Sequence, residues 1–194
     1  MGSETNSGFA GNIERRETLL KYTNRYYLPE YARFLEPNEE NIRRVAEEKA
    51  ANMRRIDEML SELERAKSDL RPEQYQELAT RFDWLKEYAV CANYLDESLW
   101  RYRYLRYLAS KETTDPEQLK YIAEAYDGVK RHEKLLFRYD PAQKFSCYDT
   151  SLGQLRVKPS LGSPMPLMKE LYEKSRQLIE GVVGPDYLPA EWRR

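Results

Sequence analysis

The chain has 194 residues, of which 41% are hydrophobic and 34% are charged, and its formal net charge is -1. A chain of this length fits one domain whose core needs neither disulfides nor metal. The nearly balanced charge provides no global field for DNA, RNA or an anionic membrane, and the mean hydropathy of -0.87 favours long helices with solvated polar faces. We therefore expect an all-α protein that binds neither nucleic acid nor a membrane.

The first residues are rich in turn formers and carry no targeting signal. The stretch MGSETNSGFAGN lacks the basic and apolar regions of a signal peptide, and no apolar run reaches the roughly 18 residues of a transmembrane helix. Met1, Gly2 and Ser3 are typical of residues added for expression, so we expect residues 1–11 to be a flexible start and residues 12–194 to form a single helical domain. The parent protein would then be longer, and its compartment is left open.

The first predicted helices are separated by prolines. Asn12 can cap a helix over 13–26, and Pro29 opens a short second helical turn through residue 34. After Asn38, a long helix is predicted over 39–67, because apolar residues recur at helical spacing and charged residues occupy the opposite face. The side chains expected to point inward are Ile42, Val45, Ala46, Ala50, Met53, Ile56, Leu60 and Leu63.

The longest predicted element is a helix over 72–109, which has no Gly or Pro after its first residue. Pro72 is favoured at the first helical position and disfavours helix at Arg71, so this helix is expected to fold back antiparallel on the one before it. Its core face is expected to contain Tyr75, Leu78, Phe82, Leu85, Ala89, Ala92, Leu99 and Tyr102. Large side chains also occupy other faces, so we expect contacts on more than one side: Trp84, Tyr88, Tyr94, Leu95, Trp100, Tyr104, Tyr107 and Leu108.

A fourth helix is predicted from Pro116 to about residue 138, with Gly128 weakening its middle by about 1 kcal/mol relative to alanine. Its inward side chains are expected to be Leu119, Ile122, Tyr126, Val129 and Leu136. Residues 139–165 are rich in turn formers and too long for an ordinary connection in a helical bundle. We expect them to form an extended irregular loop that is functional or packs against a partner.

The last predicted helix covers 166–180, where Pro166 opens it and Gly181, Gly184 and Pro185 end it. Together these elements predict an all-α, antiparallel bundle of four to five helices, two of them long.

No catalytic, metal or phosphate motif stands out. His132 is the single histidine, so a Ser-His-Asp or Cys-His site would have to use it, whereas a surface or satisfied histidine is the simpler interpretation. Neighbouring carboxylates such as Asp96 and Glu97 point about 100° apart on a helix and do not converge. Gly-rich phosphate loops and Glu-x-x-His pairs are missing, and Cys91 and Cys147 are expected to be free thiols. We therefore predict no catalytic residue, no metal and no cofactor in this chain.

Sixteen tyrosines and three tryptophans are the compositional excess with chemical meaning. The segment WRYRYLRY, residues 100–107, alternates rings with guanidinium groups. Such rings can pack against arginines within the protein, anchor a protein interface, or form a platform for a ligand. The candidate interface residues are Trp84, Trp100, Tyr104 and Tyr107.

The segments YYLPEYARFLEP, EEKAANMRRIDEMLSELERA and RPEQYQELATRFDWLKEYAVCANYLDESLWRYRYL resemble a helical region of large bacterial glycoside-hydrolase-like proteins. In these α-glucuronidase-like and hexosaminidase-like proteins, the region follows the catalytic barrel. The resemblance covers roughly residues 20–110 and implies an all-helical C-terminal domain that packs on a (β/α)₈ barrel or mediates dimer contacts. The catalytic carboxylates of such enzymes belong to the barrel, so none is carried over to this chain.

Two functions follow as expectations. The first is a noncatalytic accessory domain of a larger carbohydrate-active bacterial protein, which contacts the rest of its parent or a second copy of itself. The alternative is a stand-alone helical module that binds a partner protein beside Trp100 and Tyr104. A helical enzyme that uses His132 as a base is a third possibility.

Overall fold

A computed structural model describes residues 13, 36–136 and 163–184. The described residues are helical and contain no strand, which confirms the all-α class for this part of the chain. The predicted helices over 13–26 and through residue 34 lie outside the described residues except for Ile13, and so do the flexible start over 1–11 and most of the predicted loop over 139–165.

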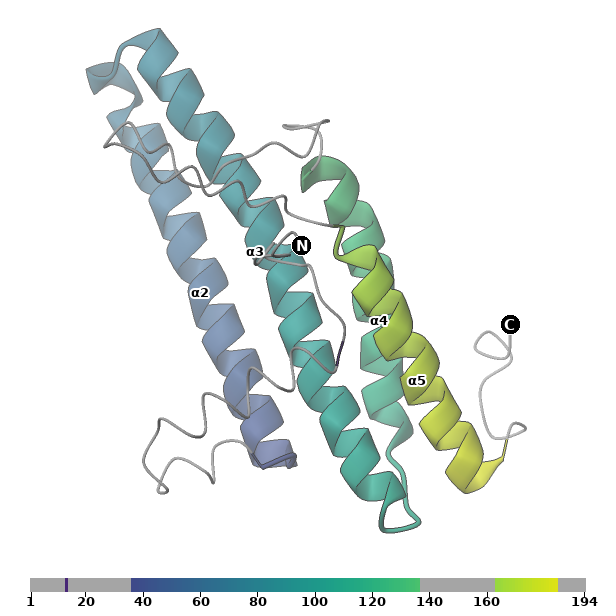
Figure 1. Ribbon diagram of the computed structural model, residues 1–194. Helices are drawn as coiled ribbons and strands as arrows, with labels where there is room; N and C mark the ends of the chain where they lie inside the picture. The colour runs from purple at the N-terminus through teal and green to yellow at the C-terminus, as the bar shows by residue number, and fades with distance from the viewer. Residues whose placement is uncertain (1–12, 14–35, 137–162, 185–194) are drawn as a thin grey trace, which may run out of the picture.

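The four α-helices of the described part are α2 (Glu39–Arg65), α3 (Pro72–Ala109), α4 (Pro116–Leu136) and α5 (Met165–Val183). Figure 1 shows α2 rising, α3 returning beside it, α4 rising again and α5 returning beside α4. The contacts agree with this order, since α3 packs against α2, α4 and α5, and α4 also packs against α5. Helix α3 is therefore the central element.

The helix ends follow the capping chemistry of the sequence. Asn38 caps α2 by accepting the Asn41 N–H at 2.9 Å, and Pro72 begins α3. Asp115 accepts the backbone N–H of Glu117 at 3.1 Å at the start of α4. Prolines and short polar side chains thus set the starts of these helices, as predicted.

Two predicted ends were wrong by a few residues. Helix α2 ends at Arg65, and the next four residues form a 3₁₀ turn, η2 (Ala66–Asp69), because the chain tightens before the corner at Pro72. Helix α5 begins at Met165 and passes through Gly181 to Val183. Gly184 caps its C-terminal end, with a φ of 85° in the left-handed region that stops a helix.

The main core cluster joins α3, α4 and α5. Its buried members, with Ile13 from the N-terminal segment, are Trp84, Cys91, Leu95, Leu99, Tyr102, Leu105, Leu119, Ile122, Ala125, Val129, Leu136, Leu167, Met168, Leu171 and Ile179. A separate and smaller seam cluster joins α2 to α3 and consists of Ile42, Val45 and Trp100. Helix α2 thus contributes no residue to the main core cluster.

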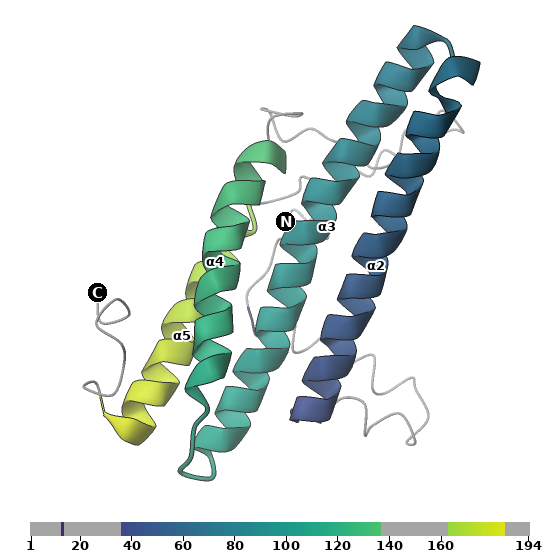
Figure 2. The ribbon, with the colours of Figure 1, turned by 180° about the vertical axis from the view of Figure 1, so that it is seen from behind.

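Two residues predicted to point inward are exposed. Ala50 on α2 faces solvent, and Leu78 on α3 is 37% exposed. Leu78 lies near the N-terminal end of α3. Figures 1 and 2 show from opposite sides that this end of α3 extends past α4 and α5. The predicted core position of Leu78 was wrong, because no described helix other than α2 lies beside that part of α3.

Candidate functional site

The two tryptophans predicted as interface residues are already covered by the chain. Trp84 is 7% exposed and belongs to the main core cluster, where its ring stacks on that of Tyr88 at a centroid distance of 5.4 Å. Trp100 is 8% exposed and packs against Ile42 and Val45 of α2. A partner protein would therefore have to contact the other two candidates unless α2 moves.

Tyr104 and Tyr107 form a stacked pair at the C-terminal end of α3, with ring centroids 6.5 Å apart and planes 17° from parallel. The Tyr104 hydroxyl donates to Oε1 of Glu39 at 3.1 Å. Burial and this carboxylate together raise the pKa of Tyr104. Tyr107 is 47% exposed, with Lys111 Nζ 5.9 Å from its ring centroid. Of the four candidates, Tyr107 has the most accessible ring.

Arginines lie over two of the rings in the segment WRYRYLRY. The Arg103 guanidinium lies 4.6 Å from the Trp100 ring centroid, and the Arg106 guanidinium lies 5.8 Å from that of Tyr102. Such cation–π contacts contribute about 0.5–1 kcal/mol each at exposed sites. Intramolecular packing of rings against arginines, one of the three interpretations of this segment, is therefore observed.

A buried polar cluster lies between α3 and α4. Arg101 Nη2 donates to Glu97 Oε1 at 2.7 Å, and Nη1 donates to Gln118 Oε1 at 2.7 Å. The same guanidinium lies 3.8 Å from the ring centroid of Tyr121. Burial, followed by a hydrogen bond to Glu97, raises the pKa of Tyr121 far above its ordinary value. These groups bind one another across the helix contact and offer no open site.

Sequence reasoning missed this cluster. The signal that was present is the i,i+4 spacing of Glu97 and Arg101, which predicts an ion pair on one helix. The spacing does not say whether the pair is buried. That depends on α4 lying across it, because Gln118 and Tyr121 supply the remaining contacts.

A second polar cluster surrounds His132, near the point where α4 ends and α5 begins. His132 Nδ1 and Glu87 Oε2 are 2.6 Å apart and link α4 to α3. The Tyr94 ring lies 6.4 Å from the imidazole, tilted by 43°. The next residue, Glu133, accepts a hydrogen bond from the Ser163 hydroxyl just before α5. His132 is thus a satisfied histidine in a helix contact, which was one of its two simple interpretations.

Cys91 lies near these carboxylates and is completely buried. Burial, with smaller contributions from Glu133 and Glu87, raises the pKa of its thiol to about 12. Because the thiolate is the nucleophilic form, this cysteine is a packing residue in the folded protein. The other predicted free thiol, Cys147, lies outside the described residues.

The described surface shows shallow hollows along the C-terminal half of α2 and the N-terminal part of α3. One is lined by Arg54, Asp57, Glu58, Ser61, Glu62 and Arg65, and another by Pro72, Glu73, Gln76, Glu77, Thr80 and Arg81. Ligand pockets are mostly lined by apolar and aromatic side chains, so these charged hollows differ from them. Within residues 36–136 and 163–184, together with Ile13, no three His, Cys, Asp or Glu side chains form a group that could hold a metal ion.

None of the described helices combines the length and the apolar character that crossing a membrane requires. No protein-family model, curated protein or solved structure compared with the chain matches it.

Proposed function

We propose that this chain is a noncatalytic helical domain that makes protein contacts, as an accessory domain of a larger protein or in association with a second copy. The observation that carries this proposal is the distal arm, defined as residues 57–83, which on α3 ends just before Trp84, the first α3 residue of the main core cluster. Figures 1 and 2 show that α2 and α3 continue past α4 and α5 at this end.

The distal arm buries little apolar surface of its own. Among its residues, Leu63 is the one buried hydrophobic side chain, whereas Met59 is 42% exposed and Leu78 is 37% exposed. In proteins, most helix stability comes from packing of an apolar face rather than from helix propensity. A projecting helix pair with so small a core therefore gains most from contact with another protein surface.

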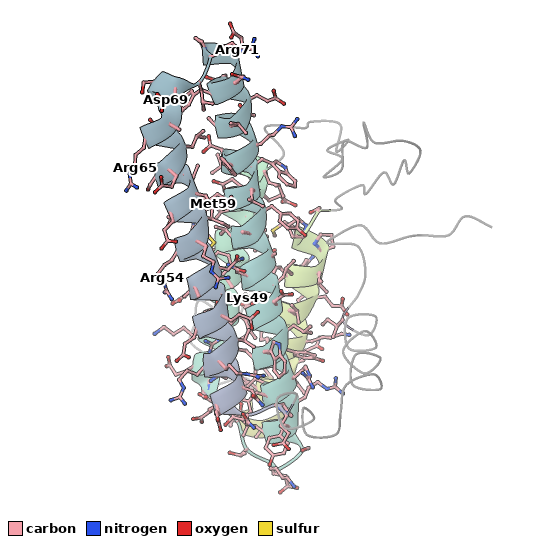
Figure 3. The ribbon with its side chains drawn as sticks, turned by 90° about the vertical axis from the view of Figure 1, so that its left-hand side faces the viewer. Lys49, Arg54, Met59, Arg65, Asp69 and Arg71 are labelled. Carbon is pink, nitrogen blue, oxygen red and sulfur yellow. The ribbon has the colours of Figure 1, made fainter. Side chains whose placement is uncertain are left out.

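Charges of both signs surround the exposed apolar side chains. Figure 3 shows Met59 on α2 between Arg54 and Arg65. Arg65 pairs with Glu62, and on α3 Arg81 pairs with Glu77 at 2.7 Å. An apolar centre with a polar rim of mixed charge is typical of protein interfaces.

The noncatalytic part of the proposal rests on the polar clusters. The Glu97 and Arg101 pair and the His132 and Glu87 pair are both engaged in helix contacts. A catalytic base must reach a proton on a bound substrate. If His132 were such a base, His132→Ala would abolish a measurable activity; we expect this variant to alter the contact between α3 and α4 instead.

The carbohydrate-active parent is supported by the resemblance over residues 20–110. We extend the proposal to the complete chain as an antiparallel bundle of four to five helices with an irregular loop before the last one. An open reading frame that joins this chain to a (β/α)₈ barrel would support the accessory-domain role, and a gene that begins at Met1 would favour the stand-alone module. The exposed ring of Tyr107, stacked on the partly buried Tyr104, supports that alternative.

The test is light scattering coupled to size exclusion, together with binding of a hydrophobic dye. We expect the chain to self-associate or to bind the dye, and the double variant Met59→Glu with Leu78→Glu to reduce both. Val183→Glu is the matched control, because Val183 is also 37% exposed but lies at the end of α5, away from the distal arm. A monomeric chain that binds no dye, or equal effects of the arm and control variants, would count against the proposal.

A further inference from the structure

Helix α2 is attached to the rest of the described structure along one side only. It packs along α3 and makes no comparable contact with α4 or α5. Its buried hydrophobic side chains are Ile42, Val45, Ile56 and Leu63, and none of them belongs to the main core cluster. Between Val45 and Ile56 no side chain of α2 is buried. Departure of α2 from its place therefore removes no buried side chain from the main core cluster, which includes Ile13 on the N-terminal side of α2.

Polar contacts between α2 and α3 recur along the whole length of the contact between these two helices, which we call the seam. Lys49 Nζ lies 2.8 Å from Asp96 Oδ2, and Lys86 Nζ lies 2.7 Å from Asp57 Oδ1. At the two ends of the seam, Glu39 accepts from Tyr104 and Glu64 accepts from Tyr75. Each contact joins one group of α2 to one group of α3, so together they specify the register in which an α2 helix can bind this face.

The connection between α2 and α3 is short and has little packing to hold it. The turn η2 (Ala66–Asp69) has no buried residue. Arg71, the residue before Pro72, is already extended, with φ of -65° and ψ of 145°. Exchange of an identical element between two copies is a low-cost route to a dimer, and short hinge loops favour it. The net charge of -1 gives little repulsion between copies.

We propose that α2 opens as a unit at residues 66–71 and is exchanged reciprocally between two copies, so that α2 of one copy covers the Trp100 and Tyr104 face of α3 of the other. This inference rests on the proposed contact function and deepens it by naming a second copy as the partner. It also gives a role to the predicted interface residue Trp100, which α2 covers within one chain.

Two charge-reversed variants of the full chain test the exchange. The first carries Lys49→Glu and Asp57→Lys on α2, and the second carries Asp96→Lys and Lys86→Glu on α3. Within either variant alone, both seam ion pairs become like-charge pairs. In an exchanged dimer of one copy of each variant, every seam pair joins opposite charges, because one seam is fully reversed and the other is native.

The two double variants have the same amino-acid composition and mass, so one of them is labelled uniformly with ¹⁵N. Native mass spectrometry of the mixture then identifies the heterodimer and the two homodimers by mass. We expect a 1:1 heterodimer to form on mixing and to exceed the homodimers of either variant at least tenfold. The matched control mixes Arg81→Glu with Glu77→Arg, which reverses an ion pair within α3 that exchange cannot restore, and no heterodimer enrichment is expected. A mixture of the seam variants without heterodimer enrichment overturns the exchange.

Two further measurements keep the test decisive if a double variant does not fold. The single pair Lys49→Glu with Asp96→Lys repeats the design with one reversal. In the wild-type chain, hydrogen exchange of α2 amides should be faster than that of α4 amides, and equal protection overturns the inference. If exchange fails while Met59→Glu with Leu78→Glu still reduces wild-type self-association, the partner surface is the distal arm and the proposed function stands.

Discussion

The phenol ring of Tyr94 on α3 lies directly against Gly128 on α4, so that a Cβ atom added at residue 128 would come within 2.6 Å of Tyr94 Cε2. The glycine that weakens α4 by its propensity thus allows close approach of the two helices. The centroids of the Tyr94 and His132 rings are 6.4 Å apart. A ring confined in this way cannot swing aside without disturbing the contact between α3 and α4.

Gly128→Ala should therefore destabilise the protein by about 1–3 kcal/mol, the usual cost of overpacking, even though alanine is the better helix former. Gly181→Ala is the matched control, because Gly181 also lies inside a helix and nothing approaches a Cβ there within 4 Å. We expect Gly181→Ala to raise the free energy of unfolding by up to about 1 kcal/mol. Urea unfolding measures both, and stabilisation by Gly128→Ala would show that Tyr94 is free to move.

Glu112 follows the end of α3 with a φ of 54°, a left-handed conformation that glycine adopts without strain. Its N–H donates to the Ala109 carbonyl at 3.0 Å, and the Thr113 N–H donates to the Leu108 carbonyl at 3.1 Å, which is the bonding pattern of a Schellman cap. We expect Glu112→Gly to raise the free energy of unfolding by about 1 kcal/mol. The converse change, Gly184→Ala, should lower it, since Gly184 has a φ of 85°. Opposite shifts of the thermal midpoint check the pair, and a lower midpoint for Glu112→Gly would contradict the argument.

Arg101 is the centre of the buried polar cluster between α3 and α4. Its side chain is 17% exposed and that of Glu97 is 10% exposed. Arg101→Ala should cost about 3–5 kcal/mol, because it leaves the Glu97 carboxylate buried without its cation.

Arg81→Ala is the control for Arg101→Ala. It also breaks an i,i+4 pair on α3, but the side chains of Arg81 and Glu77 are 58% and 64% exposed. Its expected cost is about 0.5 kcal/mol or less. Chemical denaturation that gave similar losses for the two variants would show that the cluster is solvated in solution.

Stability should fall in alkaline solution because of Cys91, whose pKa is raised from 9.0 to about 12 chiefly by burial. Between these values the unfolded chain loses the thiol proton while the folded chain keeps it. The unfolded state then binds fewer protons, so the free energy of unfolding falls by about 1.4 kcal/mol per pH unit. Tyr121, whose pKa is also raised, acts in the same direction at higher pH.

Unfolding measured at several pH values above about 8 checks this dependence. Cys91→Ala should remove the thiol contribution to the slope while leaving that of Tyr121. A slope unchanged by Cys91→Ala would mean that the thiol ionises equally in both states, against its complete burial.

Local chemistry in the sequence was sufficient for the helix starts. Pro72 and the absence of breakers up to residue 109 predicted α3 with both of its observed ends. The end of α5 was less predictable, because Gly181 and Gly184 look alike in sequence. A helix can pass through an exposed glycine at a cost of about 1 kcal/mol, and it stops where the backbone turns to positive φ, as at Gly184.

The candidate interface was harder to predict from the sequence. Periodicity placed Leu78 and Leu99 in the same apolar stripe, yet Leu78 is exposed and Leu99 is buried in the main core cluster. The aromatic residues on several faces of α3 correctly predicted contacts on more than one side, but not which helix makes each contact.

The sequence by itself determined that the chain is helical where the structure describes it, where its long helices begin, and that α3 needs neighbours on several sides. These properties depend on capping, proline geometry and spacing, which act within a few residues. Only the tertiary structure decided that α4 and α5 cover one end of α3, that α2 is the one described helix beside the other end, and that Gly128 lies against Tyr94. Burial depends on which surfaces meet, and the pattern of one helix does not specify the length or position of the helices beside it.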